Sequence, residues 1–157
     1  MFDVSDFAQP VQTSSLALAP EVTGDGWTYA WSEAQWEHKA FTYWGPMKML
    51  AIPLSTYRSV YDAVGTGYDY EYRSLLQLID AEAGQPLTRY GAIDHSDFFN
   101  SAENYYWEWM DVRRSIFMGD FIYAVSDRGV TAHRISDMTL SAEVALPGSG
   151  YDTPYWY

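Results

Sequence analysis

The stretch DVRRSIFMGDFIYAVSDRGVTAHRISDMTLSAEVAL, residues 111–146, decides the fold of this chain. It contains four short apolar runs, which are separated by turn signals rich in glycine and aspartate: Ser115–Met118, Phe121–Val125, Val130–Ile135 and Leu140–Leu146. In the last run, larger apolar side chains alternate with smaller or polar ones with a period of two. This period between glycine- and aspartate-containing turns is typical of strands in an antiparallel meander.

An internal repeat extends this pattern over most of the chain. Residues 38–55 align with 113–127, and residues 74–93 align with 130–146. Residues 1–18 align with both members of the second pair. Four strands in about 35 residues are the size of one blade of a β-propeller. The predicted fold class is therefore all-β, a partial β-propeller of about two and a half four-stranded antiparallel blades. The predicted units are a half blade at 1–18, a blade at 38–93 with an insertion at 57–73, a blade at 112–146 and a C-terminal tail at 147–157.

Three aromatic segments interrupt the strand pattern and are predicted as loops. They are residues 20–35, 57–73 and 97–111, and the outer part of the second is expected to form a hairpin. The strands predicted between them are 1–5, 11–19, 38–44, 49–54, 74–79 and 87–93.

Composition excludes several classes of partner. The formal net charge is −12 with only 9 lysines and arginines, and a phosphate backbone needs a basic surface. No run approaches the roughly 18 apolar residues of a membrane span. We therefore expect neither nucleic-acid binding nor membrane insertion. The absence of cysteine excludes disulfides, thiolate catalysis and cysteine-ligated zinc.

Histidines and carboxylates occur close together at two places, beside His38 and around His95. These are ligand types found in metal sites, but the spacing matches no established motif. Structural hydrogen bonding is the favoured interpretation of both histidines, and a metal or catalytic role is the alternative. Aspartates at the turns leave calcium as a less favoured alternative, because the ligand pattern of an EF-hand is missing. We predict no catalytic residue, no metal site and no cofactor.

Several segments resemble a known family. FDVSD at 2–6, EHKAF at 37–41, LAIPLS at 50–55 and RRSIFMGDFIYAVSDRGVTAHRISD at 113–137 resemble secreted bacterial and archaeal proteins with a C-terminal β-propeller distantly related to WD40 repeats. The resemblance covers most of residues 1–146. It implies an extracellular or cell-envelope location, although the first ten residues, MFDVSDFAQP, do not have the form of a signal peptide.

The number of predicted blades has a consequence for partners. Propellers usually have four to eight blades, so the chain is expected to be part of a longer polypeptide. Its open faces are then expected to be covered by the remaining blades of the same polypeptide or by self-association.

Aromatic residues in the predicted loops are the strongest functional signal. Flat amphipathic rings provide contact area at low entropic cost and suit protein partners and sugar faces. We predict a non-enzymatic propeller segment of a secreted or envelope protein, which binds a protein or glycan partner through aromatic, acidic loops. The alternative is part of a propeller hydrolase whose active site is completed by blades outside this segment. A structural role of the rings, as cover for the blades, also remains open. The candidate ligand-binding residues are Tyr68, Tyr70, Trp107 and Trp109.

Overall fold

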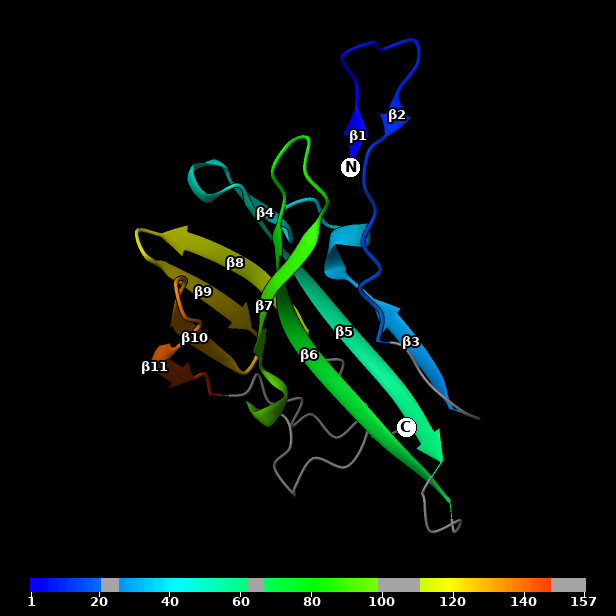
Figure 1. Cartoon of the computed structure of the whole chain (residues 1–157). Coiled ribbons are helices and arrows are strands. Elements are labelled where there is room, and N and C mark those ends of the chain that lie inside the picture. Colours follow the sequence, from blue (N-terminus) through cyan, green and yellow to red (C-terminus); the bar gives the residue numbers. More distant parts are fainter. Residues whose placement is uncertain (21–25, 62–66, 99–110, 148–157) are drawn as a thin grey trace, which may run out of the picture.

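The computed structural model describes residues 1–20, 26–61, 67–98 and 111–147 of the 157-residue chain. These residues form three antiparallel sheets of two, five and four strands (Figure 1). The helical elements in these ranges are three short 3-10 turns: η1 (Glu33–Gln35), η2 (Gly45–Met47) and η3 (Ser96–Phe98). No helix in the described ranges is long and apolar enough to cross a membrane. The all-β prediction is confirmed.

The four-stranded sheet is the meander that the sequence predicts. Its strands pair with their neighbours in the order β11-β10-β9-β8. Gly119 in the β8–β9 turn has a φ of +58°, a left-handed conformation that favours glycine. Side chains of β9 alternate between half-buried and buried, as expected for a strand with one face on a core. The bounds are β8 (Val112–Met118), β9 (Phe121–Ser126), β10 (Gly129–Arg134) and β11 (Leu140–Ala145).

The five-stranded sheet is built around one long hairpin. Strands β5 (Met49–Tyr61) and β6 (Tyr68–Asp80) pair over their whole length of 13 residues each. On the far side of β6 lies β7 (Thr88–Asp94). On the far side of β5 lie two short strands in line, β4 (Thr42–Trp44) and β3 (Trp27–Trp31). This unit corresponds to the predicted blade at 38–93, but it begins earlier in the chain.

Two of the predicted loops are wrong in detail. The hairpin expected in the segment 57–73 is confirmed, but the segment is not an interruption of the strands, because its described residues continue β5 and β6. The segment 20–35 contains β3, whose sequence WTYAW alternates large aromatic and small residues as strands do. The glycines around β3 had suggested a loop. At the N-terminus the predicted strands shrink to β1 (Phe2–Asp3) and β2 (Val11–Gln12).

Pro53 lies in the middle of β5, where a missing backbone donor would normally weaken the sheet. The position is tolerated because β4 pairs with Met49–Ala51 and β3 pairs with Ser55–Ser59, which leaves a gap opposite Pro53. The side chain of Ser32 fills this gap, and its hydroxyl donates to the Pro53 carbonyl.

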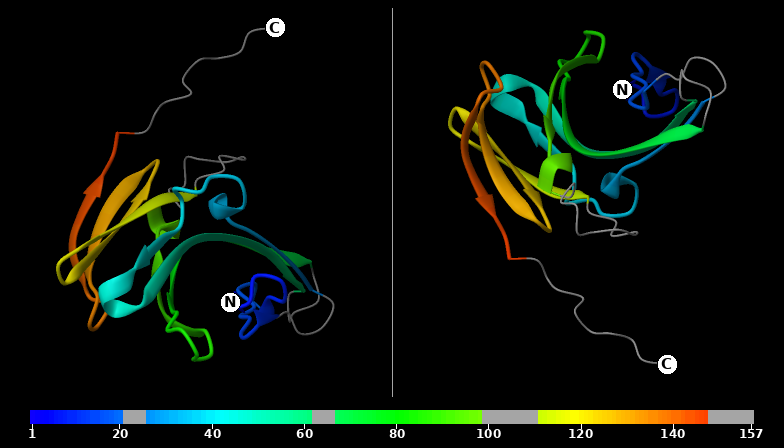
Figure 2. Two further views of the ribbon diagram at one scale, coloured as in Figure 1. Left: turned by 90° about the horizontal axis from the view of Figure 1, so that it is seen from above. Right: turned by 90° about the horizontal axis from the view of Figure 1, so that it is seen from below.

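The main core lies between the two large sheets, which pack side by side (Figure 2). Trp44 stacks on Phe117 with ring centroids 5.9 Å apart and joins the edge of one sheet to the other. Each large apolar side chain buried here contributes about 1.5–3 kcal/mol. We call the five-stranded sheet the first sheet and the four-stranded sheet the second sheet, after their order in the chain. The buried residues of this core are Met49, Ala51, Leu76, Leu78 and Ile93 from the first sheet, and Val112, Phe117, Ile122, Ala124 and Ile135 from the second sheet and the turn after β10.

His95 is fully buried directly after β7 and joins the two sheets by hydrogen bonds. Its Nδ1 lies 3.0 Å from the hydroxyl of Ser126, and its Nε2 lies 2.8 Å from that of Thr131. The edge of its ring meets Phe98 at 5.0 Å. Phe98 in turn covers Gly129, where an added Cβ would lie 2.4 Å from the phenyl ring. The predicted structural hydrogen bonding of His95 is confirmed.

Burial also controls the charge of His95. The pKa of His95 is lowered to about 4, mainly by desolvation and also by the nearby His133, while Asp94 opposes the shift. The imidazole is therefore neutral at neutral pH, and one ring nitrogen donates while the other accepts.

Apolar side chains remain exposed on the outer face of the second sheet. Ile116, Met118 and Val144 are 48%, 61% and 60% exposed. They share one face, because Ile116 lies opposite Tyr123 and the register continues through β10 to Val144. At the other end of the chain, Phe7 is 89% exposed. In the part of the chain that the structure describes, each large sheet therefore buries one face against the other, and the second sheet exposes apolar side chains on its other face.

The low pKa of His95 predicts a loss of stability in mild acid. In the unfolded chain the imidazole takes up a proton near pH 6.5, whereas the folded form resists protonation down to about pH 4. The contribution of neutral His95 to the free energy of unfolding is therefore fully present above about pH 6.5, and it is lost as the pH falls toward 4. Urea denaturation at pH 7 and pH 5 should show a loss of about 2 kcal/mol from this group. In His95→Gln this component should vanish, whereas replacing the exposed His38 should leave it intact. An equal pH response in wild type and His95→Gln would contradict the assignment.

Candidate functional site

An aromatic face covers the outer half of the β5–β6 hairpin. Residues directly opposite each other in an antiparallel pair lie on the same side of the sheet. Trp27 lies opposite Ser59, which lies opposite Tyr70, and Tyr29 lies opposite Tyr57, which lies opposite Tyr72. The same side of β3, β5 and β6 therefore carries one continuous set of rings, which we call the aromatic face: Trp27, Tyr29, Trp31, Tyr57, Tyr70 and Tyr72.

The rings of the aromatic face contact one another both across strands and along β3. Tyr57 stacks on Tyr70 with centroids 5.8 Å apart and an interplanar angle of 10°, and Trp27 meets Tyr57 at 5.4 Å. Nearer the core, Trp31 lies 5.4 Å from Tyr29 and 5.9 Å from Tyr72. Each aromatic pair adds about 0.5–1.5 kcal/mol beyond area burial. The face is therefore a mutually supported layer.

Exposure increases from the core outward along this face. Trp31 is buried and Tyr57 and Tyr72 are half-buried. Trp27, Tyr29 and Tyr70 are 46%, 58% and 61% exposed. The outer rings can therefore touch a partner while the inner ones hold them in place.

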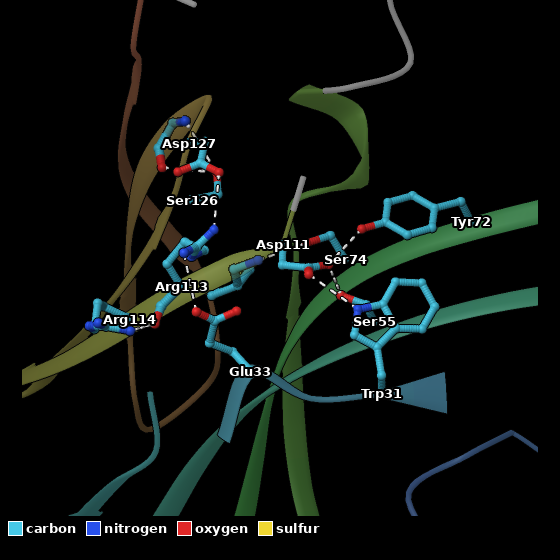
Figure 3. A network of polar contacts seen from close by, with 12 residues as sticks. Trp31, Glu33, Ser55, Tyr72, Ser74, Asp111, Arg113, Arg114, Ser126 and Asp127 are labelled. Carbon is cyan, nitrogen blue, oxygen red and sulfur yellow. Dashed lines mark hydrogen bonds and ion pairs between the residues drawn. The ribbon is translucent and has the colours of Figure 1, made fainter. Parts of the chain in front are cut away.

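A buried carboxylate fixes the inner end of the aromatic face. Asp111, which directly precedes β8, accepts hydrogen bonds from Trp31 Nε1 at 3.2 Å and from the Tyr72 hydroxyl at 2.8 Å. The hydroxyl of Ser55 also donates to it. The three donors come from β3, β5 and β6, and they converge on Asp111 from one side (Figure 3). Next to it, the Ser74 hydroxyl accepts from the backbone N–H of Val112 at 2.9 Å.

Comparison with known proteins assigns the chain to a family. A family model described as Beta propeller domain matches residues 1–138. The chain belongs to the beta-propeller domain family. No curated protein and no solved structure matched. The two large sheets are thus neighbouring parts of a propeller, and Asp111 lies where the chain passes from one to the next.

The electrostatics of this propeller junction favour hydrogen bonding over reactivity. Burial raises the pKa of Tyr72 well above its usual value, and the charge of Asp111 adds to the shift. Tyr72 therefore stays protonated, and its hydroxyl donates a hydrogen bond to the carboxylate. Beside Asp111, Arg113 lies 3.2 Å from the buried Glu33 and 3.7 Å from Asp127 (Figure 3). These contacts join η1 to the second sheet of the propeller.

The candidate residues predicted from the sequence fall in different places. Tyr68 and Tyr70 lie in β6 and not in a loop, and they are 47% and 61% exposed. Trp107 and Trp109 lie outside the described residues, so their role stays a prediction. The carboxylate that bonds to rings of the aromatic face is the buried Asp111.

Sequence reasoning missed the contribution of β3 and β5 to this site of the propeller. Trp27 and Tyr29 fall in the segment 20–35, which the sequence predicts as a loop, and Tyr57 falls in the insertion predicted at 57–73. The alternation in WTYAW was the available signal for β3. In the described ranges, no group of three or more histidine or acidic side chains is placed to hold a metal ion.

Removing the Asp111 carboxylate should destabilise this junction strongly. Asp111→Ala leaves the Trp31 N–H and the hydroxyls of Tyr72 and Ser55 without their acceptor in a buried place. We expect a loss of about 3 kcal/mol or more in chemical denaturation, and a smaller loss for Asp111→Asn, which keeps one acceptor oxygen. The matched control is Asp120→Ala in the exposed β8–β9 turn, for which we expect a change within about 0.5 kcal/mol. Equal effects of the Asp111 and Asp120 alanine variants would refute the role given to Asp111.

Proposed function

We propose that this propeller domain is a non-enzymatic recognition module whose aromatic face binds a protein or glycan partner. The observation that carries the proposal is the exposure of Trp27, Tyr29 and Tyr70. Two of these rings, Trp27 and Tyr70, pack on the half-buried ring of Tyr57. Exposed large apolar side chains that are contiguous and rigid are typical of interaction surfaces.

The rings are placed on strands, which favours binding. A loop must be ordered when a partner binds, and this ordering opposes association. Here the rings stand on paired strands, and Tyr57 is held between Trp27 and Tyr70. The ordering is therefore already complete in the free protein. A tyrosine or tryptophan also has only two side-chain torsions to fix.

The chemistry of the face fits two partner classes. Ring faces stack on the apolar faces of sugars, and the tyrosine hydroxyls offer hydrogen bonds to their rims. Tyrosine and tryptophan are also the residues that contribute most to protein–protein interfaces. The proposed setting is the cell exterior or envelope, which rests on the family resemblance of the sequence. The alternative of a hydrolase requires catalytic residues contributed by other parts of the polypeptide, and no described contact favours it.

The aromatic face can be tested with substitutions that separate binding from folding. In Tyr29→Ser/Tyr70→Ser, two exposed rings are lost while the inner layer around Asp111 stays intact. We expect binding to a glycan array or to a captured protein partner to fall at least about tenfold, which corresponds to about 1.4 kcal/mol. The melting temperature should change by only a few degrees.

Two further variants complete this test. Tyr43→Ser removes a tyrosine of β4 that is 51% exposed, on the opposite side of the same sheet, and it should bind like wild type. Tyr29→Phe/Tyr70→Phe keeps the rings, and should retain binding if stacking dominates. Loss of stability without loss of binding in the serine variant would show that the rings serve as cover for the propeller.

A further inference from the structure

The opposite side of the same hairpin carries a second surface of different chemistry. Because side chains alternate along a strand, Arg58, Glu71 and Arg73 point away from the aromatic face. The N-terminal segment lies on this side, in the concavity of the curved sheet (Figure 2). Between the segment and the sheet there is a cavity of about 280 Å³. It is lined by Leu18, Pro20, Leu54, Thr56, Arg58, Glu71, Arg73, Leu75, Gln77 and Arg89.

This cavity is positively charged in a strongly acidic chain. Among the residues that the structure describes, three of the 9 basic residues of the chain line it, together with one acidic residue, Glu71. Asp94 lies 3.7 Å from Arg73, so these described groups together carry one positive charge in excess. A chain with a net charge of −12 gains nothing in solubility by gathering its cations in one hollow. The excess charge therefore indicates a negatively charged occupant.

Glu71 orients two of the guanidinium groups. Its Oε2 lies 2.5 Å from Arg58, and its Oε1 accepts from Arg73 Nε at 2.6 Å. The hydrogen bond from Arg73, supported by the one from Arg58, lowers the pKa of Glu71 against the opposing effect of burial. Glu71 thus stays charged and holds both arginines at the cavity wall. In the described part of the chain, Arg58 Nη1 and Arg73 Nη2 make no hydrogen bond, so each group keeps a free donor edge.

Arg89 completes the set from β7. Its Nη2 donates to the backbone carbonyls of Ala17 at 2.9 Å and Leu18 at 3.0 Å. These bonds fix the N-terminal segment over the cavity, and so does the bond from the Leu87 N–H to Ser14 Oγ at 2.8 Å. In the ranges that the structure describes, Arg89 pairs with no carboxylate. Its remaining donors are available to an anion.

The size and the walls of the cavity define the anion further. A volume of about 280 Å³ is at the low end of small-molecule sites. Three leucines and one proline contribute apolar surface to its wall. Guanidinium groups bind carboxylates and phosphates through paired hydrogen bonds. We propose that this cavity binds a small organic carboxylate, with the carboxylate at Arg58, Arg73 and Arg89 and a short apolar body against Leu18, Leu54 and Leu75.

Hexanoate is a suitable probe for this site. Titration into ¹⁵N-labelled protein, followed by NMR of the arginine Nε–H groups, should give saturable shifts at Arg58, Arg73 and Arg89. Hexanamide has the same apolar body without the charge and should bind at least tenfold more weakly. Inorganic phosphate, which has the charge without the apolar body, should also bind more weakly than hexanoate. Absence of saturable shifts at these arginines, or equal binding of hexanamide, would overturn the proposal, and tighter binding of phosphate would overturn the assignment to a carboxylate.

Three arginine variants locate the binding. Arg58→Gln and Arg89→Gln should each weaken hexanoate binding about tenfold or more. Arg114→Gln is the matched control on the second sheet, because Arg114 also pairs with a glutamate, Glu37 at 3.7 Å, and its side chain is 37% exposed against 40% for Arg58. It should bind hexanoate within twofold of wild type. Arg89 also fixes the N-terminal segment, so Arg89→Gln can change the backbone NMR spectrum. If it does, the result for Arg58→Gln is the one that decides whether hexanoate binds at this cavity. Equal binding by Arg58→Gln and Arg114→Gln would refute the site.

Discussion

Asp111 is buried at the point where the chain enters the second sheet, and its carboxylate accepts hydrogen bonds from three strands of the first. A carboxylate taken out of water is strongly destabilising unless donors replace the lost solvent. The indole of Trp31 and the hydroxyls of Ser55 and Tyr72 provide that replacement. The requirement acts in both directions, because the donors are also buried and need the acceptor. The beginning of β8 is therefore fixed relative to β3, β5 and β6, and with it the packing of the two sheets.

The same constraint explains why one hairpin can carry two different surfaces. Beyond Ser55 and Ser74 the hairpin extends past the second sheet, so neither side of its outer half belongs to the main core (Figure 1). The two-residue period of the strands places aromatic side chains on one side and the charged pair of Arg58 and Glu71 on the other. Ring contacts support both parts of this face, because Trp31 contacts Tyr29 and Tyr72, and Tyr57 contacts Trp27 and Tyr70. The strand register places the two groups side by side. A long hairpin standing free would otherwise be only marginally stable.

The parts of this fold that could be predicted are those encoded by short-range signals. The second sheet was predicted strand by strand, because turn residues such as Gly119 and Asp120 separate its apolar runs and each strand pairs with its neighbour. The network around Asp111 could not be predicted, because Trp31 and Ser55 lie 80 and 56 residues before it in the sequence. The tyrosine-rich ends of β5 and β6 are predicted as a loop because clustered aromatic rings indicate ligand binding more directly than they indicate strand pairing. Tyr70 is a candidate site residue from the sequence because it lies in a tyrosine-rich segment. That Trp27 and Tyr57 lie beside it follows only from the strand register.

The open outer face of the second sheet follows from the geometry of a propeller blade. A blade in a ring contacts a neighbour on each side, and among the described residues the second sheet packs on the first through the face that carries Phe117 and Ile122. Its other face exposes Ile116, Met118 and Val144 in a pattern suited to a further sheet. We propose that further blades of the same polypeptide, or a second copy of the chain, cover this face. Such a contact would lie along β8 to β11, away from the outer half of the hairpin (Figure 1). A neighbour placed there would not cover the aromatic face, as the proposed role of that face in recognition requires.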